Sequence, residues 1–195
     1  EELSEKTGIT FGQTNLLATS HPATLDAGSQ SEQMNELLEA LDSLGPETGL
    51  IFTMPNADTD GRALMEQLKQ YVATRPNARA FTSMGQLNYL SALSHVDAVV
   101  GNSSSGLYEA PSLKIPTVNI GDRQKGRLQA TSIINCAAEK EAIAGAIQQA
   151  FRMDTSTTSN PYGEGGSAKK IADILAALPD PASLLQKHFF PVPLS

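Results

Sequence analysis

The sequence lacks features that are typical of several classes of protein. It has one cysteine, Cys136, so an internal disulfide is excluded. Lysine and arginine total 14 against 21 aspartates and glutamates, and the net charge of -7 argues against a general nucleic-acid or anionic-membrane surface. No apolar stretch is long enough to span a bilayer, and no signal peptide with a basic start and an apolar middle occurs. These absences fit a cytoplasmic protein.

Motifs for common cofactors are missing as well. No cluster of side chains has metal-ligand spacing, and neither a nicotinamide fingerprint nor a P-loop occurs. We therefore expect no metal and no other cofactor. Cys136 lies in a short apolar segment, which favours a buried strand residue over a nucleophile.

What the sequence does contain is a regular alternation of short apolar runs and amphipathic segments. Its 195 residues are enough for one sizeable domain with a buried core. Strands are predicted over residues 15–20, 49–54, 78–82, 96–100, 116–120 and 132–136. Amphipathic helical patterns separate most of them. This alternation predicts an α/β fold with a doubly wound, Rossmann-like parallel sheet of about six strands.

Both ends of the chain have sequence patterns that are unusual for the ends of a complete domain. Residues 1–6, followed by Gly8, have the pattern of the last turns of a helix that ends in a glycine cap. We therefore expect the chain to be a fragment. Residues 179–195 form a tail that is more apolar than a free end should be. Two interpretations stay open for this tail, namely packing on its own domain and contact with a missing domain.

The stretch over residues 97–127, DAVVGNSSSGLYEAPSLKIPTVNIGDRQKGR, is the centre of the candidate functional region. Its GNSSSG motif follows a predicted strand and precedes a short helix predicted over residues 107–113. Serine hydroxyls, backbone N–H groups and the helix dipole at such a point can bind a phosphate or diphosphate. Capping of a surface helix by the serines is the alternative. Pro111 should kink or shorten the predicted helix.

Several polar motifs should meet at one edge of the sheet. In an open parallel sheet, ligands bind beyond the carboxyl ends of the strands. The loops at those ends carry His21, Asn56 with Asp58, Ser83 with Met84, Ser103 to Ser105, and Asp122 with Arg123. From the residues alone, His21 reads as a structural histidine and Arg123 as a solvated loop residue. The convergence makes a ligand site the competing interpretation.

The chain resembles a known family in its motifs. GNSSSGLYEAPSLKIPTVNIGDRQKGR, ATSHPAT, PNADTDGR and NPYGEGGSAKKI occur in the order found in the carboxyl-terminal domain of hydrolysing UDP-N-acetylglucosamine 2-epimerases of the sialic and nonulosonic acid type. The resemblance covers nearly the whole chain. It implies the carboxyl-terminal half of a glycosyltransferase-B-type two-domain fold. Residues 1–195 would be one nucleotide-sugar-binding domain without its amino-terminal partner, towards which residues 179–195 could pack.

The resemblance implies roles for residues near the sugar and the ribose. His21 matches an active-site histidine, so it would assist acid/base or leaving-group chemistry. Glu109 would bind the ribose, because each hydroxyl of a cis-diol can donate to one carboxylate oxygen. His95 and His188 match no such position, and we interpret both as structural.

Further residues match positions that bind the nucleotide in the family. Asn56 would bind the nucleotide, and a backbone group of Met84 would meet the uracil. Ser103, Ser104 and Arg123 would stabilise the diphosphate as it leaves.

For the intact enzyme, the resemblance implies elimination of UDP and hydration of the resulting glycal, which yields N-acetylmannosamine. The substrate would be UDP-N-acetylglucosamine or a related UDP-sugar, and the full-length protein would self-associate. The carboxylates for proton transfer would come mainly from the missing domain, so we expect this chain alone to bind nucleotide weakly without turnover. Two alternatives stay open, namely the donor-binding domain of a nucleotide-sugar glycosyltransferase and a non-catalytic UDP-sugar-binding module.

Overall fold

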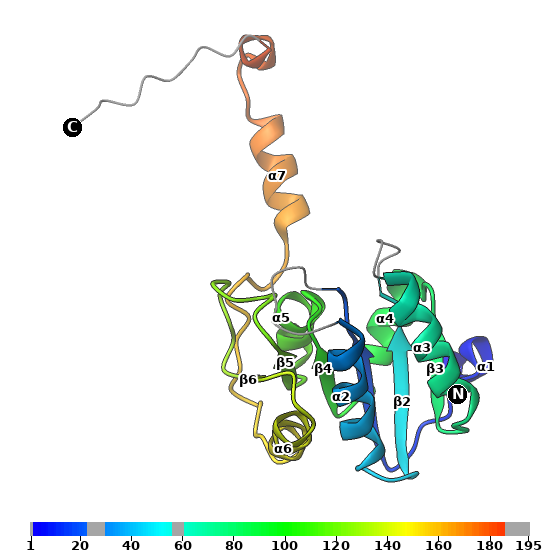
Figure 1. Cartoon of the computed structure of the whole chain (residues 1–195). Coiled ribbons are helices and arrows are strands. Elements are labelled where there is room, and N and C mark those ends of the chain that lie inside the picture. The colour runs from blue at the N-terminus through cyan, green and yellow to red at the C-terminus, as the bar shows by residue number, and fades with distance from the viewer. Residues whose placement is uncertain (1, 23–29, 56–60, 186–195) are drawn as a thin grey trace. The chain divides into compact units, whose positions relative to one another are not determined.

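Six parallel strands form one sheet in the computed structural model, which describes residues 2–22, 30–55 and 61–185 (Figure 1). The strands are β1 (Thr14–Thr19), β2 (Thr48–Thr53), β3 (Ala78–Phe81), β4 (Ala98–Gly101), β5 (Thr117–Ile120) and β6 (Ile133–Cys136). Each lies within two residues of its predicted bounds. The strand order is β3-β2-β1-β4-β5-β6. The predicted doubly wound α/β fold is therefore confirmed.

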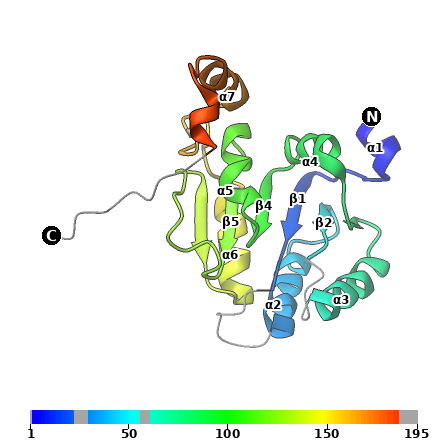
Figure 2. The same cartoon turned by 90° about the horizontal axis from the view of Figure 1, so that it is seen from above.

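Helices cover both faces of the sheet (Figure 2). The helices are α1 (Glu2–Thr7), α2 (Gln30–Asp42), α3 (Gly61–Ala73), α4 (Gly85–Leu93), α5 (Ser105–Tyr108) and α6 (Lys140–Ala150), and a 3-10 turn, η1 (Ala110–Leu113), follows α5. α2, α3 and α6 lie on one face, and α1, α4 and α5 lie on the other. The four central strands β1, β2, β4 and β5 are thus buried from both sides, which explains their largely apolar sequences, whereas the edge strands β3 and β6 are partly exposed.

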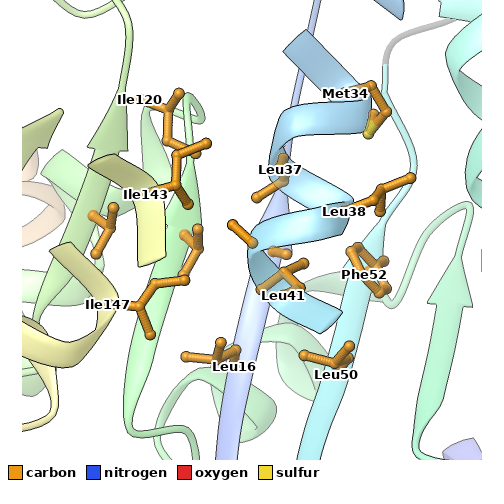
Figure 3. Close-up of a cluster of buried hydrophobic side chains, with 14 of the residues drawn as sticks. Leu16, Met34, Leu37, Leu38, Leu41, Leu50, Phe52, Ile120, Ile143 and Ile147 are labelled. Atoms are coloured by element: carbon orange, nitrogen blue, oxygen red, sulfur yellow. The ribbon is translucent and has the colours of Figure 1, made fainter. Parts of the chain in front are cut away.

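The larger apolar cluster lies between the sheet and the helices α2, α3 and α6 (Figure 3). Leu16 of β1 packs there with Leu41 of α2 and Ile147 of α6. Successive strand residues point to opposite faces, so Leu17 of β1 belongs instead to the cluster beneath α4. β1 therefore contributes apolar side chains to the clusters on both faces of the sheet.

β1 and β4 lie side by side at the point where the strand order reverses. At their amino ends, the backbone N–H of Asn15 donates to Asp97 Oδ2 at 2.7 Å, and the N–H of Asp97 donates back to the Asn15 carbonyl at 2.8 Å. At their carboxyl ends, Thr19 pairs with Gly101. Ligands of doubly wound sheets bind at this switch point, so the loops that follow β1 and β4 are where a ligand site is expected.

The connection between β5 and β6 contains no helix. Residues 121–132 run from one strand to its parallel neighbour as turns and irregular backbone. A parallel pair usually needs a crossover of a dozen or more residues, most often through a helix. α6 packs on both strands, but their crossover connection supplies no helix of its own.

A second compact unit comprises Gly163–Ser195. It holds α7 (Ser167–Ala176) and the 3-10 turn η2 (Pro181–Leu184). In the described part of both units, none of the helices has the length and apolar character needed to cross a bilayer.

Gly101 sits where β4 touches β1 most closely. Its φ is +129°, and a Cβ built on it would lie 1.9 Å from the Thr19 carbonyl oxygen. A side chain at this position would therefore force β4 away from β1.

We expect Gly101→Ala to lower the free energy of unfolding by about 2–4 kcal/mol, through backbone strain and the clash with Thr19. Gly145→Ala is the matched control, because Gly145 lies inside α6 and a Cβ added there would meet nothing within 4 Å. The control should gain about 0.5–1 kcal/mol. Urea denaturation measures both, and equal effects of the two variants would contradict the packing described for Gly101.

Candidate functional site

Asn102 joins the turn after β1 to the loop after β4. Its Oδ1 accepts a hydrogen bond from the backbone N–H of His21 at 2.7 Å, and its Nδ2 donates to the His21 carbonyl at 2.8 Å. The N–H of Asn102 itself donates to the Thr19 carbonyl at 3.0 Å. Asn102 is 6% exposed, so its carboxamide is almost completely shielded from solvent. The paired bonds fix the backbone of His21 against the start of the serine loop.

The loop after β5 meets the same residue. Arg123 Nη1 donates to the Asn102 carbonyl at 2.9 Å, and Gln124 Nε2 donates to the same oxygen at 2.7 Å. Gln124 is buried, whereas Arg123 is exposed and keeps further guanidinium N–H groups for other partners. Three separated segments, which follow β1, β4 and β5, are thus joined through Asn102.

The three serines of the GNSSSG loop have different surroundings. Ser103 Oγ accepts from the backbone N–H of Ser105 at 3.3 Å, and Ser105 Oγ accepts from the Tyr89 hydroxyl at 2.5 Å. Ser104 precedes α5, but its side chain makes no capping hydrogen bond. Within the described residues its hydroxyl has no partner. Capping therefore does not account for Ser104, and its hydroxyl is available to a ligand.

The helix predicted over residues 107–113 is wrong in its extent. α5 has four residues, and the chain then tightens into η1, which contains Pro111 and is followed by Lys114 with φ 57°. Pro111 thus shortens the helix, as predicted. One turn has a weak dipole, so a helix end contributes little here, and the donors available to an anion are the serine hydroxyls and Arg123.

Glu109 and Met84 lie at the borders of this region. Glu109 is exposed at the junction of α5 and η1. Met84 immediately precedes α4, and its side chain is buried in the apolar cluster with Ile51 and Leu93. Only the backbone of Met84 is left for a ligand, which suits the role predicted for it. Asn56 lies outside the described residues, and its role stays a prediction.

Tyr89 of α4 holds the serine loop through its hydrogen bond to Ser105. Burial raises the pKa of its phenol, and the negative charge of Glu109 raises it further. The hydroxyl therefore stays protonated and donates to Ser105.

Neither Tyr89 nor Asn102 was identified as a site residue from sequence. Asn102 had a detectable signal, because asparagine after a strand-ending glycine often bonds nearby backbone; Tyr89 had none beyond its helical spacing.

Cys136 ends β6 and is half-buried. Burial raises the pKa of its thiol to about 11. The thiol is therefore protonated at neutral pH, which agrees with its interpretation as a structural residue. In the described residues no group of three or more histidine, cysteine, aspartate or glutamate side chains could hold a metal ion.

We expect Cys136 to react slowly with iodoacetamide. With the thiol pKa at about 11 rather than 9.0, the reactive thiolate is about 100-fold scarcer at pH 8 in the folded protein than in the unfolded chain. The rate should rise tenfold per pH unit until the pH approaches 11. Mass spectrometry of alkylation with and without urea measures this, and a rate independent of unfolding would contradict the burial.

We expect Asn102→Ala to destabilise the fold by about 1–3 kcal/mol, because it removes the two hydrogen bonds that the buried Asn102 carboxamide makes to the backbone of His21. Asn160→Ala is the comparison, since Asn160 Nδ2 donates to two oxygens and its Oδ1 accepts from the Tyr162 N–H, but these bonds are exposed to solvent. Its loss should cost less than about 1 kcal/mol. Urea denaturation compares the two, and similar losses would show that the His21 contacts are not special.

Comparison with known proteins gives a consistent family. The family model described as UDP-N-acetylglucosamine 2-epimerase matches residues 1–176. Escherichia coli polysialic acid biosynthesis protein P7 is 34% identical over 177 residues, which cover 89% of this chain and 45% of that protein. Campylobacter jejuni GDP/UDP-N,N'-diacetylbacillosamine 2-epimerase (hydrolyzing) is 42% identical over 120 residues, 61% of this chain and 31% of that protein. The chain thus spans less than half the length of these relatives.

Solved structures agree on the fold. The Methanocaldococcus jannaschii UDP-GlcNAc 2-epimerase, solved with UDP-GlcNAc and UDP, matches with a TM-score of 0.69 at 18% identity. The match covers 90% of this chain and 48% of that one.

Proposed function

Because the chain belongs to the UDP-N-acetylglucosamine 2-epimerase family, we propose that it is the UDP-binding half of a hydrolysing enzyme of this family. The main support is the junction at Asn102, which brings His21, the serine loop and Arg123 to the switch point of the sheet. A diphosphate needs hydroxyl and cationic donors that converge from more than one segment. The described residues supply that combination at this junction.

Arg123 and Ser104 are the proposed diphosphate ligands. Arg123 is fixed at one nitrogen by the Asn102 carbonyl, so the rest of its planar guanidinium is held in a defined orientation for a bidentate contact. The Ser104 hydroxyl, which has no partner among the described residues, and the backbone of Ser103 lie in the adjoining loop. These donors would stabilise the charge that develops on UDP as it leaves.

The remaining candidates surround this centre. Glu109, four residues beyond Ser105, would accept hydrogen bonds from the ribose diol. The backbone of Met84 would meet the base, and Asn56 would add a further nucleotide contact. His21 has its backbone fixed by Asn102, so its ring is carried on a rigid turn, and it would assist proton transfer or departure of the diphosphate.

In the intact protein, the proposed reaction has two steps. A base removes the proton from C2 while the bond from C1 to the UDP oxygen breaks, which leaves a glycal and UDP. Water then adds its hydroxyl to C1 and a proton returns to C2 from the opposite face, which gives N-acetylmannosamine. Because the chain spans less than half of its relatives, we propose that the C2 base belongs to a domain outside this chain.

We expect this chain to bind UDP with a dissociation constant near 1 mM, about -4 kcal/mol, and to bind uridine more weakly because uridine lacks the diphosphate. Ser104→Ala and Arg123→Gln should each weaken UDP binding by about tenfold. Ser94→Ala is the control, since Ser94 lies at the far end of α4 and bonds only its own helix and His95.

Calorimetric or NMR titration measures these affinities. Equal binding of uridine and UDP, or no loss in the two site variants, would exclude the proposed diphosphate site. Product analysis on a full-length protein that contains this chain tests the reaction itself. Free N-acetylmannosamine without an acceptor supports it, whereas transfer to an acceptor would indicate a glycosyltransferase.

A further inference from the structure

A cavity of about 740 Å³ lies beside the loop that replaces a helix between β5 and β6. We call it the β5–β6 pocket. Its lining includes Gln33, Asn119, Lys125, Arg127, Gln129 and Asn135. The volume falls in the range of small-molecule sites. A crossover helix would normally bury this part of the sheet under apolar side chains, whereas here several polar side chains share the lining with Cys136, Ala137 and Ala138.

Three carboxamides form a connected network in the β5–β6 pocket. Asn119 Nδ2 donates to Asn135 Oδ1 at 2.8 Å, and Asn135 Nδ2 donates to Gln129 Oε1 at 2.8 Å. Gln129 Nε2 donates back to Asn135 Oδ1 at 3.2 Å. These bonds fix the orientation of all three side chains. The network therefore presents a preorganised polar wall from β5, β6 and the loop between them.

The Asn119 side-chain carbonyl oxygen is left over from this network. Asn119 is 2% exposed, and its Oδ1 has no hydrogen-bond partner among the described residues. A buried acceptor without a donor is unfavourable, and buried carboxamides normally find a partner. The missing partner is an O–H or N–H donor. A hydroxylated ligand in the β5–β6 pocket would supply it.

The charges of the pocket lining are unequal. Lys125 pairs with Asp122 at 2.8 Å, so these two neutralise each other. Arg127 has no carboxylate partner among the described residues; its guanidinium lies 5.7 Å from the ring of Tyr108. The described lining thus carries one unneutralised guanidinium in a protein of net charge -7. A carboxylate is the group that a guanidinium pairs with most favourably.

The β5–β6 pocket is separate from the proposed nucleotide site. Arg123 and Gln124 of the loop bond Asn102, whereas their neighbours Asp122 and Lys125 line the pocket. None of the proposed nucleotide ligands that the structure describes is in the lining. One loop therefore presents two different sets of side chains to two different sites.

We propose that the β5–β6 pocket is a second binding site, for a small polyhydroxylated carboxylate. A ligand hydroxyl donates to Asn119 Oδ1, and the ligand carboxylate pairs with Arg127. Amide groups of Asn135 and Gln129 contact further hydroxyls. This site does not depend on the proposed function, because it uses none of the residues assigned to UDP.

Sodium glucuronate is the probe, and glucose is the comparison that has the hydroxyls without the acid. The 15N-labelled whole chain is titrated to about 20 mM, on the order of a weak site, and the side-chain NH2 signals of Asn119, Gln129 and Asn135 are followed. We expect saturable shifts with glucuronate and at least about tenfold weaker binding of glucose. UDP at saturation should leave the glucuronate affinity unchanged.

Arg127→Gln should lower glucuronate binding to the level of glucose and leave glucose unaffected. Arg152→Gln, an exposed arginine elsewhere on the chain, is the matched control and should change nothing. Four outcomes would overturn the proposal. The first is the absence of saturable shifts, which would mean that only water fills the pocket. The second is equal affinity for glucose and glucuronate, and the third is unchanged glucuronate binding in Arg127→Gln. The fourth is displacement of glucuronate by UDP.

Discussion

The contact between β1 and β4 is the constraint on which the candidate site depends. The two strands are fastened at both ends, by Asn15 with Asp97 and by His21 with Asn102. Each of these residue pairs is joined by two hydrogen bonds. The backbone of Asn15 bonds the side chain and the N–H of Asp97, and the backbone of His21 bonds the side chain of Asn102. Two bonds of this kind resist both sliding and rotation of one strand against the other. The strand ends, and the loops that continue from them, are therefore held in a single register.

This register gives the polar residues of the site a fixed frame. The carbonyl of Asn102 receives two donors from the loop after β5, and Tyr89 holds the serine loop from α4. Supporting residues are buried or partly buried, whereas Arg123 and Glu109 are exposed. A rigid inner layer with reactive groups on its outer side is the arrangement that preorganises a ligand site.

The sequence was sufficient to predict the sheet but not its internal hydrogen bonds. The four central strands are buried on both faces and read as largely apolar runs, and the two edge strands are short runs that alternate with helices in the same way, so all six were found within two residues. The short helix after GNSSSG was misjudged because periodicity extends through Leu113, whereas Pro111 ends the α-helical bonding earlier. Asn102 could not be assigned to His21 from sequence, because the two are 81 residues apart and meet only when the sheet is complete.

The helix-free crossing between β5 and β6 has a different origin from the rest of the fold. Elsewhere the connections place apolar helices over the strands, but residues 121–132 leave Asn119 and Asn135 to satisfy one another. Composition alone gave no sign of this, because isolated asparagines are common in both strands and loops. Their placement on the same face of neighbouring strands follows from the register of β5 and β6.

The pairing of β1 with β4 also bears on how the domain folds. Closing it brings together residues about 80 positions apart, and pairings of high contact order form slowly because the intervening chain must be ordered first. Each half of the sheet can be built from nearer neighbours, β1 with β2 and β4 with β5. The seam between the halves is also where the candidate ligand residues meet. Ligand affinity therefore reports the docking of two half-sheets, and a chain with both halves formed but undocked would have no site.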